Sequence, residues 1–95
     1  MAAYIIAQLE VTNPAAFDHY RAQIPEVIAQ YGGRYLVRGG HTETLEGEWH
    51  VPRLVVLEFP SMEQLQRFYH SPEYAPLIAL RQKAARSVLV AVEGV

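Results

Sequence analysis

Two spacings of hydrophobic residues alternate along this chain of 95 residues, and they predict strands and helices in turn. Short apolar runs typical of strands occupy residues 3–11, 34–40, 53–59 and 86–95. After the first run, apolar side chains recur at the spacing of one helix face: Phe17, Tyr20, Ile24, Val27, Ile28 and Tyr31. A second helical face follows the third run and contains Leu65, Phe68 and Tyr69. The predicted order is strand, helix, strand, strand, helix, strand.

The predicted helices carry signals at their ends. Asn13 directly precedes Pro14, which places an N-cap residue before a proline at the first helical position. Gly32 suits the left-handed conformation that often follows a helix. Ser61 and Gln64 have the spacing of a capping box. These signals indicate where both helices begin and where the first one ends.

The second helix is expected to break soon after it begins. In the segment YHSPEYAPL (69–77), Ser71 can cap a new helical piece and Pro72 can occupy its first position. Pro76 offers a second place for that piece to begin. Leu77, Ile78 and Arg81 then fall on one face. We expect the break to bend the second piece over the sheet.

The element order predicts a single α+β domain over residues 1–95 with the ferredoxin-like plan. This plan places helices on one face of a four-stranded antiparallel sheet. The runs LVVLEF and SVLVAV are almost continuously apolar. In a sheet with one face in water, apolar and polar residues alternate along each strand. The second face should therefore be buried against the sheet of a second copy. The expected assembly is a homodimer that forms a dimeric α+β barrel.

Composition narrows the classes of function. The net charge is −2 without a basic stripe, which argues against nucleic-acid binding. No apolar run approaches the roughly 18 residues that a membrane span needs, and the N-terminal segment lacks the basic region of a signal peptide. Cysteine is absent, which excludes disulfides and thiol chemistry and fits a cytoplasmic location.

Several segments together resemble a known family. They are FDHYR, YGGRYLVRGG, LEGEWHVPRLVVLEFPS, SPEYAPL and ARSVLVAVEGV, and the likeness runs from about Ala3 to Val95. The family is the bacterial domain of unknown function 1330, in the dimeric α/β barrel superfamily. The resemblance implies a cytoplasmic homodimer and no particular reaction. Other members of that superfamily include cofactor-free monooxygenases, lactone isomerases and haem-binding enzymes, so activity cannot be transferred by fold alone.

Glu58 is the candidate catalytic residue because it lies inside an apolar strand, where an unpaired carboxylate is costly to bury. It is either a general acid or base with a raised pKa, or one half of an ion pair with Arg38, Arg53 or Arg81. Arg53 and Glu58 have opposite strand parity, so they should point to opposite faces. Arg81 or a residue on the neighbouring strand is then the expected partner.

Aromatic and arginine side chains are the candidate ligand contacts. A tyrosine offers an apolar ring with a polar tip, which suits a pocket, although the same residues can simply fill a core. Trp49 could close a pocket mouth or cover the edge of a dimer. The fork of Arg81 can hold a carboxylate, or its head can reach into water. The full set of candidates is Tyr20, Trp49, Arg53, Tyr69, Tyr74 and Arg81.

The histidines do not form a metal motif. His41 and His50 flank a segment rich in glutamate, but no HxH or HExxH spacing occurs. His70 lies at the helix break, where it could act as an acid or base or interact with the helix dipole. The glycine pairs lack the GxGxxG spacing of a dinucleotide site. We expect neither a metal nor a cofactor.

These observations lead to one hypothesis with two alternatives. The break at Ser71 should place Tyr69, Tyr74 and Arg81 around a small cavity between helices and sheet, with Glu58 as a proton-transfer group. The ligand would be a small organic acid or an aromatic compound, handled by a cofactor-free enzyme. The alternatives are a binding module without turnover and a purely structural dimer.

Overall fold

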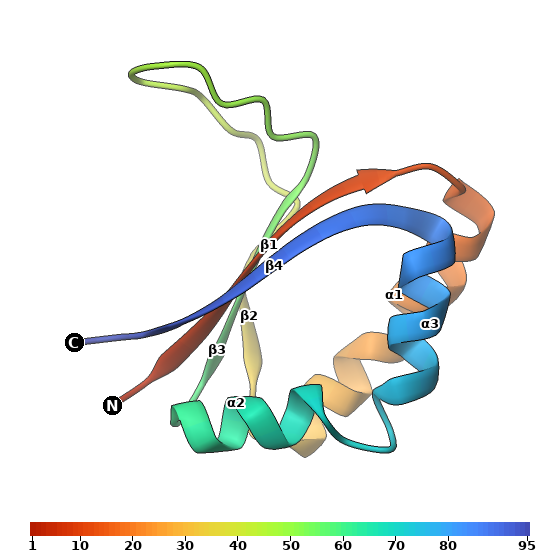
Figure 1. Cartoon of the computed structure of the whole chain (residues 1–95), viewed down its shortest axis with the longest axis vertical. Helices are drawn as coiled ribbons and strands as arrows, with labels where there is room; N and C mark the ends of the chain where they lie inside the picture. The colour runs from red at the N-terminus through yellow and green to blue at the C-terminus, as the bar shows by residue number, and fades with distance from the viewer.

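The computed structural model describes all residues, 1–95, and confirms the predicted α+β fold. The elements are β1 (Ala3–Val11), α1 (Pro14–Gln30), β2 (Arg34–Arg38), β3 (Leu54–Phe59), α2 (Met62–Tyr69), α3 (Ala75–Ala84) and β4 (Ala85–Glu93). The strand order is β2-β3-β1-β4, and every neighbouring pair is antiparallel. The helices lie together on one side of the sheet. Both chain ends lie at one end of the sheet, and α1 and α3 lie toward its other end (Figure 1).

The ends of α1 and α2 follow the sequence signals, with one difference. The side chain of Asn13 accepts a hydrogen bond from the Ala16 amide at 3.2 Å. Ser61 Oγ likewise accepts from the Gln64 amide at 3.1 Å. The side chain of Gln64 does not complete the capping box, because its Nε2 instead donates to the Tyr31 carbonyl at 2.9 Å. That bond ties the start of α2 to the end of α1.

The helix break forms where the sequence predicts it. Ser71 Oγ donates to the Phe68 carbonyl at 2.8 Å and accepts from the Tyr74 amide at 3.1 Å. This buried hydroxyl closes a turn over residues 72–74, and α3 begins directly afterwards at Ala75. The second helical piece therefore begins three residues beyond Pro72.

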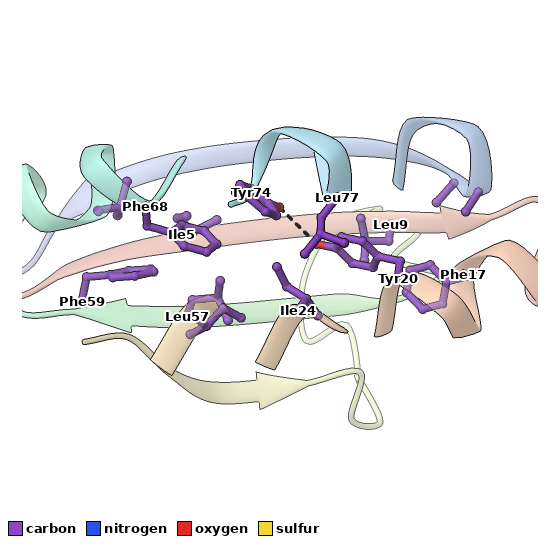
Figure 2. Close-up of a cluster of buried hydrophobic side chains, with 14 of the residues drawn as sticks. Ile5, Leu9, Phe17, Tyr20, Ile24, Leu57, Phe59, Phe68, Tyr74 and Leu77 are labelled. Atoms are coloured by element: carbon purple, nitrogen blue, oxygen red, sulfur yellow. Dashed lines mark hydrogen bonds between the residues drawn. The ribbon is translucent and has the colours of Figure 1, made fainter. Parts of the chain in front are cut away.

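The core fills the space between the helices and the sheet face that points toward them, which we call the inner face (Figure 2). Phe59, Phe68, Ile28 and Leu65 are its largest fully buried side chains. The ring centroids of Phe59 and Phe68 are 5.0 Å apart, and Phe68 stacks on Tyr74 at 4.4 Å. These aromatic contacts fix the position of Tyr74 at the start of α3.

The outer face of the sheet carries no helix and remains apolar. Its exposed hydrophobic side chains include Ile6, Val88, Val90 and Val92, with exposed fractions of 38–61%. Residues 39–53 between β2 and β3 form no strand or helix and project away from the body as an arm (Figure 1). Gly47 takes a positive φ of 75° within this arm, where the sequence predicts a turn.

Candidate functional site

A cavity of about 40 Å³ lies between α1, α3 and the inner face of the sheet. Twelve of its sixteen lining residues are hydrophobic, and the other four are Arg21, Arg38, Arg53 and Arg81. Tyr20, Tyr35 and Tyr74 add hydroxyl groups, whereas no Asp, Glu or His lines the cavity. We call this cavity the arginine pocket. Its polar groups are cations and phenols, so it presents an excess of hydrogen-bond donors.

Tyr20, Tyr74 and Arg81 form one hydrogen-bonded group at the pocket wall. Arg81 Nη1 donates to the Tyr74 hydroxyl at 2.5 Å. The hydroxyls of Tyr74 and Tyr20 are 3.1 Å apart and are hydrogen-bonded (Figure 2). Burial raises the pKa of Tyr74 far above its ordinary value, so its phenol keeps its proton. The structure thus brings together three of the predicted ligand contacts.

Arg81 is a buried cation without a carboxylate partner. Only 3% of the residue is exposed, and its Nε has no hydrogen-bond partner. None of the chain's salt bridges includes it. Burial acts to lower the pKa of Arg81, but the neighbouring phenols of Tyr74, Tyr20 and Tyr69 raise it more. The side chain therefore stays charged, and its Nε–H donor is unused.

Arg53 reaches the same pocket from the end of the arm. Its guanidinium lies over the Phe17 ring, 5.4 Å from the centroid, and its Nε also lacks a partner. Burial, followed by the charges of Arg21 and Arg38, lowers the pKa of Arg53. The pocket thus holds several cations that repel one another and no anion that offsets them.

A β-bulge places Tyr35 and Arg38 on the pocket side of β2. Tyr35 pairs with Leu57 and Arg38 pairs with Val55, and the register shifts between Tyr35 and Val37. Regular alternation would send residues 35 and 38 to opposite faces. The extra residue at Leu36 turns Arg38 back to the inner face, where its guanidinium lies 4.6 Å from the Tyr35 ring centroid. Bulges commonly re-aim side chains in this way near functional sites.

Glu58 does not join the pocket. It pairs with Tyr4 and Arg34 in the sheet register, between the inward residues Leu57 and Phe59, and so lies on the outer face. Its Oε1 accepts a hydrogen bond from Arg34 Nε at 2.6 Å. Of the two partners expected for Glu58, Arg81 is excluded, because alternation along β3 directs the carboxylate away from the helices, and a residue on the neighbouring strand is confirmed. Its partner is a neighbouring-strand arginine, Arg34.

Two other predicted contacts also lie outside the arginine pocket. Tyr69 contacts Tyr74 edge-on, with ring centroids 5.8 Å apart, and faces an adjacent groove. Trp49 is on the arm and 56% exposed, and its Nε1 donates to Gln8 Oε1 at 2.9 Å. Gln8 belongs to the outer face of β1, so Trp49 does not close the mouth of this pocket.

The sequence interpretation missed Arg21, Tyr35 and Arg38 as pocket residues. Arg21 directly follows Tyr20 on α1, and its ion pair with Asp18 is long at 3.5 Å. Tyr35 and Arg38 were missed because the bulge brings both to the pocket side of β2, and no residue in RYLVR indicates a bulge. No group of three or more His, Cys, Asp or Glu side chains is placed to hold a metal ion. No helix is long and apolar enough to cross a membrane.

Comparison with solved structures shows the same fold in several proteins. A protein of unknown function from Rhodopseudomonas palustris has a TM-score of 0.78 at 18% identity, with 99% of this chain and 82% of that chain covered. SnoaB, a cofactor-independent oxygenase from Streptomyces nogalater, has a TM-score of 0.68 at 15% identity, with 99% of this chain and 93% of that chain covered. A dimeric ferredoxin-like protein of unknown function from a Jannaschia species has a TM-score of 0.68 at 14% identity, with 99% of this chain and 100% of that chain covered. At these identities the likeness shows the fold alone.

The fold and the pocket define a ferredoxin-like α+β protein with an arginine-lined cavity between helices and sheet. A family model described as "Domain of unknown function (DUF1330)" matches residues 2–95, and the chain belongs to that family. No curated protein of similar sequence was found. The family resemblance expected from the sequence is confirmed.

Proposed function

We propose that the arginine pocket binds the carboxylate of a small organic acid. The observation that carries this proposal is the pair of unpartnered Nε atoms on Arg53 and Arg81, both at the wall of one cavity. A buried charge is normally paired, because leaving it unpaired in an apolar surrounding is costly. A ligand carboxylate would supply the missing acceptors.

The chemistry of the pocket favours an anion over a neutral ligand. Arginine presents N–H groups in a planar fork that matches the two oxygens of a carboxylate. The hydroxyls of Tyr20 and Tyr74 extend the set of polar groups around it. No carboxylate of the chain lines the cavity, so nothing there repels an anion. The cavity of about 40 Å³ is large enough for ordered water, and therefore for a head group of a few atoms.

A titration with propanoate tests this proposal. Proton–nitrogen correlation spectra resolve arginine Nε–H groups, and those of Arg53 and Arg81 should shift on binding. Arg81→Gln and Arg53→Gln should each weaken binding roughly 10- to 100-fold, the range expected for a charged hydrogen bond. Arg67→Gln is the matched control, because Arg67 is exposed on α2 and pairs with Glu63. The proposal would be overturned if propanoate still shifted the remaining pocket signal with unchanged affinity in both pocket variants. It would also be overturned if propanoate shifted neither signal in the wild type.

Cofactor-free turnover of a bound compound is the second candidate function, since the pocket's donors suit a substrate that carries its own negative charge. The pocket offers no carboxylate or imidazole as a base, and Tyr74 holds its proton. A substrate that ionises by itself is therefore required. Incubation with 1,3-cyclohexanedione under air tests this: consumption that requires Arg81 supports an enzyme, and binding without consumption supports a binding module.

We also propose that the protein works as a cytoplasmic homodimer joined through the outer sheet face. Ile6, Val88, Val90 and Val92 form an exposed apolar surface there, which a second copy would cover. The Jannaschia protein of the same fold is described as dimeric. The absence of cysteine supports the cytoplasmic location. The mass of the protein in solution tests the dimer.

A further inference from the structure

A second hollow lies next to the arginine pocket, between α2 and β4. Its volume is about 260 Å³, and six of its eight lining residues are hydrophobic. Gln66 and His70 are its polar members, and no Asp, Glu, Lys or Arg lines it. We call it the α2–β4 groove. It is much larger than the arginine pocket and differs from it in carrying no arginine.

The two hollows share a wall. Ile5 and Leu89 line both of them, from neighbouring strands β1 and β4. On the helix side, the groove residue Tyr69 meets the pocket residue Tyr74 edge-on at 5.8 Å between ring centroids. The wall thus consists of apolar side chains and two aromatic rings. Leu89 is only partly buried and belongs to an edge strand, so it borders both spaces without being locked in the core.

We propose that the α2–β4 groove receives the apolar tail of the same ligand whose carboxylate binds in the arginine pocket. This inference rests on the proposed function and adds the class of ligand: monocarboxylic acids with an unbranched or flat apolar tail. The size of the pocket is the first argument, because about 40 Å³ accommodates a head group and little more. The remainder of a larger acid has to lie elsewhere.

The chemistry of the groove is the second argument. For the tail to reach the groove, the Leu89 side chain, which is only partly buried and borders both hollows, has to move aside; the tail then lies against Leu65, Tyr69 and Ala91. Burying each methylene there should strengthen binding about fourfold, by the usual transfer free energy of a CH₂ group. A second charge on the tail would lie among apolar walls without a partner, so acids with a single charge are preferred over dicarboxylates.

A chain-length series tests this inference. Dissociation constants are measured for propanoate, butanoate, hexanoate and octanoate, with hexan-1-ol as the uncharged probe. In the wild type, affinity should rise about fourfold per methylene until the groove is full. Ala91→Phe should abolish this rise and leave propanoate binding unchanged, because Ala91 lines the groove and not the pocket. Hexan-1-ol should bind at least tenfold more weakly than hexanoate.

The control is Ala79→Phe, the same change at an exposed position of α3 that lines neither hollow. It should keep the full chain-length dependence. Unchanged propanoate binding shows that Ala91→Phe is folded, and Gln66→Trp, at an exposed residue that lines only the groove, serves if it is not. Equal affinities along the series, or an Ala91→Phe protein that still favours octanoate, would overturn the tail site while the proposed anion site stands. If no acid binds to the wild-type protein, or if hexan-1-ol binds to it as tightly as hexanoate does, the anion site itself is overturned.

Discussion

Gly39 lies directly against the guanidinium of Arg53. A β-carbon at Gly39 would come within 2.6 Å of Arg53 Cζ, and the residue also has a positive φ of 70°. A side chain at this position would therefore push the arginine out of place and strain the backbone. The glycine that directly follows β2 thus positions a residue of the arginine pocket.

The first prediction concerns this contact. Gly39→Ala should displace the Arg53 side chain and weaken propanoate binding about tenfold, close to the loss from removing Arg53. The backbone strain should also reduce the free energy of unfolding by about 1–3 kcal/mol. Gly40→Ala is the control, because no atom lies within 4 Å of its added carbon. Titration and thermal unfolding of both variants measure the effects, and equal behaviour of the two would contradict the prediction.

The second prediction concerns the hydroxyl of Tyr74. Tyr74→Phe removes the acceptor of Arg81 and the partner of Tyr20 while keeping the stacked ring. Leaving a buried cation with fewer acceptors should lower the free energy of unfolding by about 1–3 kcal/mol. Tyr4→Phe is a suitable control, because the Tyr4 hydroxyl forms no hydrogen bond within the chain. Denaturant unfolding compares the two, and a Tyr74→Phe protein as stable as the wild type would show that this hydroxyl is dispensable.

The third prediction concerns Glu58. Glu58→Gln should leave propanoate binding unchanged, because the residue lies on the face of the sheet opposite the arginine pocket. The ion pair with Arg34 is largely exposed on the arginine side, so its loss should change stability by about 1 kcal/mol or less. Titration and thermal unfolding provide the measurements. A large loss of binding would mean that Glu58 acts on the pocket, as the sequence first indicated.

The fourth prediction concerns the outer sheet face. Val90→Arg should convert the proposed homodimer to monomers or aggregates, because a charge would be buried between two apolar sheets. Light scattering after size-exclusion chromatography gives the mass. Ala79→Arg places the same charge on the exposed surface of α3 and should leave the dimer intact. If Val90→Arg remains a soluble dimer of unchanged mass, the barrel assembly is excluded.

Much of the fold could be predicted because its signals are local. Asn13, Ser61 and Ser71 mark helix starts and the break through hydrogen bonds that span only three residues. Arg81 could be assigned to an inner face because helical spacing links it to Leu77 and Ile78. These predictions needed no knowledge of which distant residues would meet.

The site was predicted less completely, and strand geometry explains why. Alternation correctly places Arg53 and Glu58 on opposite faces of the sheet. Because both sheet faces are apolar, the pattern does not indicate which of these two residues points toward the helices. The bulge at Leu36 then reverses the parity of Arg38. A register shift depends on the pairing partner, and a single strand read by itself does not contain it.

The turn closed by Ser71 determines how the internal space is divided. Had the helix continued, residues 69 and 74 would project about 140° apart around one axis, and their rings would not meet. The turn instead brings Tyr69 and Tyr74 into edge contact. Each ring then faces a different hollow, one charged and one apolar. A single serine hydroxyl between two short helices therefore sets the partition between the two compartments.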